Sequence, residues 1–177
     1  MLANPLGAGG GGAGKFKIPL MPGSAELVGA ASEPLLIGMG GTNLNWSELR
    51  FNDTAINQAN WIISGAMTAN YAGGQITIRL RWKAAAITGA VLWQAQLIGR
   101  TTGEQIDTAM ETARSFSATT VNGTTELTNN SELTFTSTAA ELTAGDDWFI
   151  RILRKANDAA DTMSGDAKLF SAQVFEV

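Results

Sequence analysis

The clearest pattern in the sequence is a strict alternation of apolar and polar residues over 75–83. Ile76, Ile78, Leu80 and Trp82 occupy one side of an extended chain, and Thr, Arg, Arg and Lys occupy the other. A period of two is typical of a β-strand with one buried face. We therefore predict a half-buried strand here, with its even-numbered side chains directed into a core.

Six further segments carry short apolar runs bounded by turn-forming residues, which favours strands. They cover residues 44–51, 60–67, 91–98, 132–137, 148–154 and 168–177. The segment 148–154 is apolar on both faces, so we expect it to lie centrally in a sheet. The facing of 168–177 stays open. Only 103–114 has apolar residues at helical spacing, and an irregular loop crossing is its alternative.

Strands in succession without alternating helices predict an all-β fold, an antiparallel β-sandwich. A jelly-roll-like topology is the first choice and an immunoglobulin-like topology the second. We place this sandwich domain over residues 35–177.

Residues 1–34 differ from the rest of the chain. A Gly-rich run over 7–14 has great backbone freedom and few side chains to pack, and an extended segment punctuated by Pro follows it. A flexible linker is the plain interpretation. Apolar residues flank the run, however, so it could thread a narrow gap while they anchor it. We predict an extended arm over 1–34 that binds a partner molecule through Leu2, Leu6, Phe16, Ile18, Leu20 and Met21.

The amino-acid composition excludes several classes of chemistry for this protein. The 177-residue chain has neither Cys nor His, which removes disulfides, thiol nucleophiles, the imidazole base and the usual zinc ligands. A net charge of −4 with 16% charged residues gives no electrostatic basis for binding nucleic acid. No basic, apolar leader and no long apolar span are present, so we expect neither a signal peptide nor a membrane segment. We predict no enzyme: no catalytic residues, no cofactor and no resident metal.

Two groups of residues invite a functional interpretation. The loop 157–166 gathers Asp158, Asp161 and Asp166, whose oxygens could hold Ca²⁺, although Asp, Asn, Ser and Gly are also what tight turns use. We interpret it as a turn. The five Trp residues could stack on sugars if exposed, but each falls within an expected strand, which favours a core or subunit-interface role. They are Trp46, Trp61, Trp82, Trp93 and Trp148.

The second half of the chain carries a family resemblance. The segment 142–154, LTAGDDWFIRILR, and the segment 157–169, NDAADTMSGDAKL, resemble a recurrent ending in tailed-bacteriophage virion surface proteins. The strands at 73–82 and 89–93 look like the central pair of the same family. The resemblance covers roughly residues 45–177. It implies a small β-rich protein of the head-decoration or fibre type, with no catalytic residues.

From these patterns we expect a non-enzymatic virion structural protein that decorates or cements the capsid. It would be made in the host cytoplasm and lie on the capsid surface, bound through its arm to other virion proteins, the major capsid protein above all. By analogy with such proteins we expect a homotrimer. The alternative is a receptor- or carbohydrate-binding module of a tail or fibre, which an exposed aromatic cluster beside Asn and Asp would favour.

Overall fold

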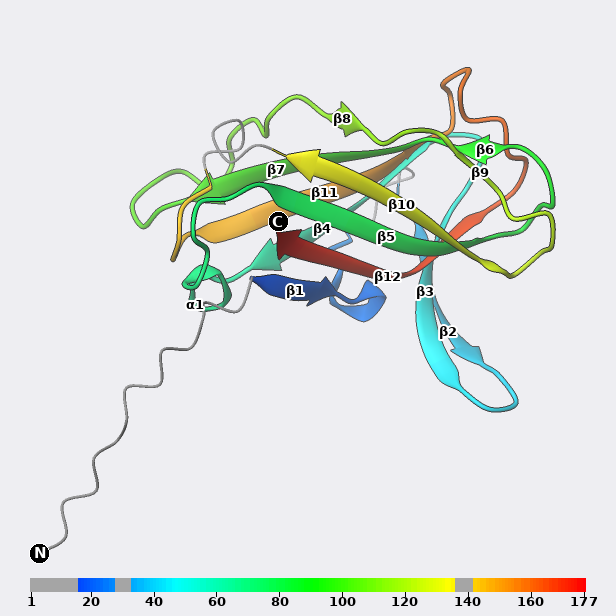
Figure 1. Cartoon of the computed structure of the whole chain (residues 1–177), viewed down its shortest axis with the longest axis horizontal. Coiled ribbons are helices and arrows are strands. Elements are labelled where there is room, and N and C mark those ends of the chain that lie inside the picture. The colour runs from blue at the N-terminus through cyan, green and yellow to red at the C-terminus, as the bar shows by residue number, and fades with distance from the viewer. Residues whose placement is uncertain (1–15, 28–32, 136–141) are drawn as a thin grey trace, which may run out of the picture.

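The computed structural model describes residues 16–27, 33–135 and 142–177 and consists of antiparallel sheets packed around one apolar core (Figure 1). Sheet A has the order β10 (Thr128–Phe135), β5 (Ile76–Ala84), β12 (Ala167–Glu176), β3 (Asn45–Phe51) and β2 (Leu35–Gly40), and β1 (Lys17–Leu20) also pairs with β12. Sheet B has the order β4 (Ile56–Ile63), β11 (Asp147–Lys155), β7 (Trp93–Arg100) and β8 (Arg114–Ser115). The short strands β6 (Ala90–Val91) and β9 (Thr119–Thr120) pair with each other.

The fold class predicted from the sequence is confirmed: the structure is an antiparallel, jelly-roll-like β-sandwich. In β5, Ile76, Ile78, Leu80 and Trp82 are completely buried, as their alternation predicts. The prediction was too simple for the opposite face. There Thr77 is also buried, because β10 lies beside it and the Thr77 and Thr134 hydroxyls are hydrogen-bonded at 2.8 Å.

Two expectations left open by the sequence are now decided. The segment 103–114 forms no helix: it is an irregular crossing that ends in β8. In the final strand β12, Leu169, Ala172 and Val174 face the core, and the register shift between Leu169 and Ser171 changes which alternate residues are buried. This strand is central in sheet A, because one of its edges pairs with β5 and the other is shared by β3 and β1. The strand β11 lies between β4 and β7, as expected from its apolar faces.

The domain boundary predicted at residues 34/35 is corrected by β1. This strand pairs with β12 from Lys17 opposite Phe175 to Leu20 opposite Ala172. The short helix η1 (Pro22–Ser24) follows, and Glu26 then forms an isolated bridge to Asn60 on β4. Residues 16–27 therefore belong to the sandwich and link its two sheets.

Helices play a small part in the described chain. Besides η1, one short helix, α1 (Gly65–Thr68), follows β4. None of the helices in the described ranges is long and apolar enough to cross a membrane.

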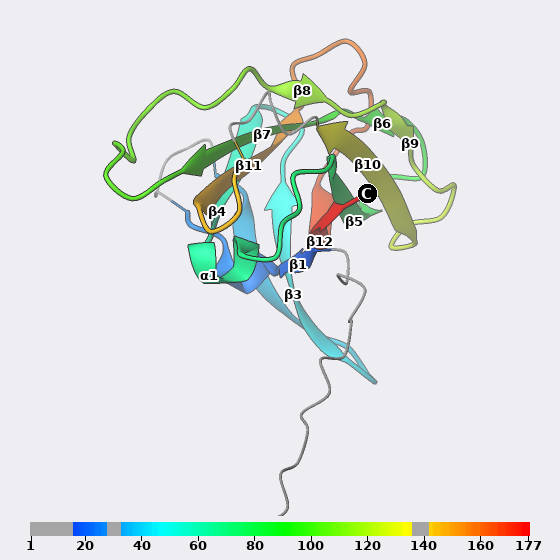
Figure 2. The same ribbon diagram turned by 60° about the vertical axis from the view of Figure 1, so that its left-hand side comes forward.

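A hairpin of β2 and β3 projects from one end of the sandwich, as both ribbon views show (Figures 1 and 2). Its base is fixed by Glu48, whose side chain is fully buried. The Glu48 carboxylate accepts hydrogen bonds from Arg50 at 3.0 Å and from Trp46 at 3.2 Å, and it forms an ion pair with Lys83 at 3.0 Å. Burial alone would raise the pKa of Glu48, but the hydrogen bonds from Lys83, Trp46 and Arg50 outweigh it and hold the pKa below its ordinary value. The carboxylate is thus stabilised in its charged form.

Candidate functional site

The outer face of sheet B carries a row of amide and guanidinium groups. In the strand register Arg151 on β11 lies between Asn60 on β4 and Gln96 on β7. Its Nε donates to Asn60 Oδ1 at 2.9 Å, and its Nη1 donates to Gln96 Oε1 at 3.3 Å. All three side chains are half-buried. The row is thus tethered across three strands while part of each group still faces solvent.

An apolar row lies directly beside this polar one. Phe149 on β11 is opposite Ile62 on β4 and Ile98 on β7. Phe149 is half-buried, while Ile62 keeps 56% of its surface exposed. An aromatic ring next to planar polar groups is a combination that suits ligands with both apolar faces and hydroxyl edges.

The irregular crossing between β7 and β8 borders this face and encloses two hollows. The first, of about 150 Å³, is lined by the loop residues Ile106, Asp107, Thr108 and Met110 and, on the sheet side, by Asn60, Ile98, Phe149 and Arg151, among others. The second, of about 190 Å³, is lined by Arg100, Glu104, Ile106, Asp147 and Phe149, among others. Phe149 and Ile106 line both, so the hollows adjoin beside the aromatic ring.

The bordering loop and β8 are anchored to the sheet by two glutamine side chains of β7. Gln96 Nε2 donates to the backbone oxygen of Glu111 at 2.8 Å, and Gln94 Nε2 donates to Ser115 Oγ at 3.0 Å. Burial raises the pKa of the Glu111 carboxyl, although the nearby Arg114 opposes that shift.

The polar row and the aromatic ring beside it form one candidate binding surface on the outer side of sheet B. We call this surface, made by Asn60, Gln96, Phe149 and Arg151, the amide face.

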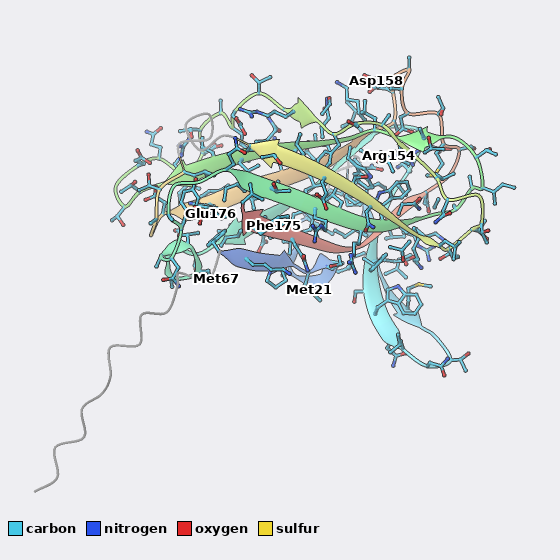
Figure 3. The ribbon with its side chains drawn as sticks, in the orientation of Figure 1. Met21, Met67, Arg154, Asp158, Phe175 and Glu176 are labelled. Carbon is cyan, nitrogen blue, oxygen red and sulfur yellow. The ribbon has the colours of Figure 1, made fainter. Side chains whose placement is uncertain are left out.

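The loop 157–166 is organised by an internal cation. Arg154 is fully buried at its base, and Asp158 lies in the loop above it (Figure 3). The guanidinium binds Asp161 in a bidentate manner, Nε to Oδ2 at 3.0 Å and Nη2 to Oδ1 at 2.8 Å. Its other three donors reach backbone oxygens of Phe51, Met163 and Gly165 at 3.1, 2.7 and 2.6 Å.

All five guanidinium donors are therefore used. The same Asp161 Oδ2 also accepts from the Leu92 backbone N–H at 3.0 Å. Asp161 is thus committed to Arg154, and no group of three or more acidic side chains within metal-binding reach occurs in the described residues. This geometry is that of a turn held by an ion pair.

Four of the five tryptophans lie in the core, as the strand pattern favours. Trp61, Trp82, Trp93 and Trp148 are at most 2% exposed. Trp46 is half-buried on the projecting hairpin, with Lys83 Nζ 4.8 Å from its ring centroid. The aromatic side chain at the amide face is Phe149, which the sequence interpretation did not single out. No local signal in the sequence marks Phe149, because the segment 148–154 is apolar on both faces.

The predicted arm residues do not form one docking surface. Phe16, Ile18 and Leu20 are at most 5% exposed and belong to the core of the same chain. Their role as partner anchors is corrected, because β1 directs Ile18 and Leu20 into the sandwich, and the ring centroids of Phe16 and Trp148 lie 5.0 Å apart. Met21 is 54% exposed, and Leu2 and Leu6 lie outside the described residues.

Comparison with known proteins finds likeness at the level of the fold. No family model matches the sequence, and no curated protein matches it. Among solved structures, the CBM22-2 xylan-binding domain of Xyn10C from Paenibacillus barcinonensis superposes with a TM-score of 0.51 at 13% identity, covering 88% of this chain and 92% of that one. A family 11 carbohydrate-binding module from Clostridium thermocellum, solved with a β-1,3-1,4-mixed-linked tetrasaccharide, gives a TM-score of 0.49 at 9% identity over 92% and 89% of the two chains. The first likeness supports the β-sandwich assignment.

Proposed function

We propose that this protein is a non-catalytic carbohydrate-binding module that holds a neutral polysaccharide on the amide face. The observation that carries the proposal is the tethered row of Asn60, Arg151 and Gln96 beside Phe149. The fold that it shares with a xylan-binding domain adds support.

The chemistry of the row fits sugar hydroxyls. A hydroxyl both donates and accepts, so it pairs well with an amide, which has two donors and an acceptor, and with a guanidinium, which only donates. Because Arg151 already spends Nε and Nη1 on the two amides, its orientation is set before a ligand arrives, which reduces the entropy lost on binding. The Phe149 ring offers an apolar surface for the C–H face of a pyranose.

The size of the site favours one or two sugar units at a time. Each hollow is smaller than the roughly 300–1,000 Å³ of a drug-sized pocket, while the two adjoin at Phe149. A chain-like ligand lying along the strands would use both hollows, whereas a free monosaccharide would use one. We therefore expect oligosaccharides to bind much more tightly than monosaccharides.

Affinity electrophoresis in gels containing xylan, mixed-linkage β-glucan or cellulose derivatives tests the proposal, followed by titration calorimetry with oligosaccharides. Phe149→Ala and Arg151→Ala should each weaken binding at least tenfold. Arg81→Ala is the matched control, because Arg81 is an exposed cation on the opposite sheet, between the buried Leu80 and Trp82. Binding by neither the native protein nor any variant across a broad glycan panel would reject the proposal, as would equal loss in the control.

A virion surface role is the second candidate, and the observation that favours it is the projecting β2–β3 hairpin with its exposed Leu35, Leu36 and Leu44. On this proposal the protein decorates a capsid as a homotrimer bound to the major capsid protein, or serves as the glycan-binding part of a tail or fibre. Mass spectrometry and antibody labelling of purified particles distinguish the two locations. Absence from particles would exclude both.

A further inference from the structure

The edge of sheet A formed by β2 has none of the protection usual for an exposed strand. Natural edge strands carry charges, prolines or bulges that prevent pairing with another chain. The six residues of β2 contain no charge and no proline, and their register with β3 is unbroken. Leu35 is 64% exposed and Leu36 42%.

The other sheet edges within the described ranges are different. β10 carries Glu132, β1 carries Lys17 and Pro19, the strands β6, β8 and β9 are only two residues long, and the β4 edge is bridged by Glu26. The β2 edge is therefore the one best suited to accept a further strand.

The hydrogen-bond pattern of the hairpin shows which groups this edge offers. Gly41 N donates to Leu44 O at 2.8 Å across the turn, so this pair is of the hydrogen-bonded kind. Hydrogen-bonded and non-bonded pairs alternate along an antiparallel ladder. Leu35, Ile37 and Met39 therefore direct their amides toward β3. The backbone groups of Leu36, Gly38 and Gly40 point outward, away from β3.

We propose that the partner of this edge is β2 of a second copy of the chain, paired antiparallel about a two-fold axis at Gly38. Only this register makes all three outward-pointing residues face one another: Gly38 opposite Gly38, and Leu36 opposite Gly40. On one face of the joined sheet Leu36 then lies opposite Gly40 of the second copy, which has no side chain to clash with the leucine. On the other face Ile37 pairs with Met39 of the second copy, which extends the apolar surface beside Trp46. A two-fold contact uses the same patch on both subunits, as this strand requires.

Charge favours a second copy over a charged partner. Glu48 and Arg50 are the only charged residues over 35–51, and they pair with each other at 3.0 Å. The chain as a whole carries −4, so two copies repel least where they meet through this neutral hairpin. A nucleic acid or an acidic or basic peptide would find no complementary charge there.

The strength of the contact follows from its size. One six-residue strand covers much less than the roughly 800 Å² per partner of a stable interface. We therefore expect a weak dimer that dissociates on dilution, and not an obligate one.

Sedimentation velocity over a wide concentration range tests the proposal with variants at Gly38. A Cβ atom added at Gly38 meets nothing within 4 Å in the single chain, and Gly38 is exposed, so Gly38→Lys and Gly38→Glu should fold normally. In the dimer the two added charges would face each other directly across the pair. The native protein should show a concentration-dependent rise in sedimentation coefficient, and each charged variant alone should lose it. An equimolar mixture of the two variants should regain it.

The uncharged control Gly38→Ser should associate as the native protein does. A native protein that stays monomeric at all concentrations would overturn the proposal, and so would association that persists in Gly38→Lys. Association lost on deleting residues 1–15 but retained in Gly38→Lys would assign the contact to the N-terminal segment instead and equally reject β2 pairing. None of these readouts involves glycan binding, so the result is independent of the proposed function.

Discussion

Replacing Arg154 with Met should be among the most damaging conservative substitutions in this protein. Methionine preserves much of the apolar volume of the arginine but removes all five donors. The Asp161 carboxylate, 1% exposed, would keep only the Leu92 N–H as a partner, and three backbone oxygens would lose theirs. Breaking a buried ion pair from one side costs about 3–5 kcal/mol. For a chain of this size that corresponds to a fall in melting temperature of roughly 6–20 °C.

Thermal unfolding followed by circular dichroism measures the effect, with Arg151→Met as the control. Arg151 lies on the same strand, but it is half-buried and binds neutral amides, so its loss should cost about 1 kcal/mol or less. Combining Arg154→Met with Asp161→Asn should cost clearly less than the two single changes added together, because the second change removes the orphaned charge. A melting temperature for Arg154→Met within about 2 °C of the native value would refute this reasoning.

Four further outcomes follow from the structure. Ile78→Asp should destabilise by several kcal/mol through an unpaired buried charge, whereas Arg81→Asp on the exposed side of the same strand should be mild, and equal melting curves would contradict the assigned facing. A chelator should leave the melting temperature unchanged, and a drop restored by Ca²⁺ alone would show that the folded protein binds Ca²⁺ and would contradict the interpretation of the 157–166 loop as a turn if Asp158→Asn removed the effect. Because the folded pKa of Glu48 lies below its ordinary 4.5, the native protein should lose stability as pH falls below about 4.5, and Glu48→Gln should lose less over that range in urea titrations. Deleting residues 1–34 removes β1 and three core side chains, so it should abolish cooperative unfolding, while normal unfolding of that variant would show β1 to be dispensable.

The sequence predicted those strands whose own residues show a clear pattern of apolar positions. β5 is recognisable because four buried side chains recur at every second residue, and β11 because apolar residues occupy both of its faces. β1 was missed because it is four residues long, contains Pro19 and follows a Gly-rich run. It becomes a strand only by pairing with β12, about 150 residues later, and that partner leaves no local signal.

The candidate site lay beyond sequence reasoning for a related reason. Asn60, Gln96 and Arg151 come from three strands and share a row only through their register. Arg151 and Arg154 look equivalent in the run WFIRILR. They differ in which side of β11 they occupy, so one is half-buried on the outer face and the other is enclosed by the 157–166 loop. That distinction needs the neighbouring strands to be placed.

The position of β12 has a consequence for synthesis of the protein. This strand holds β5 on one side and β3 and β1 on the other, yet it follows all three in the chain. Sheet A cannot close until residue 176 has left the ribosome, at a translation rate of roughly 5–20 residues per second. Until then the edges of β3 and β5 that pair with β12 are open and offer sites for aggregation. A chain truncated before Ala167 lacks the strand that joins the sheet, so premature termination should yield protein that chaperones and proteases recognise as unfolded.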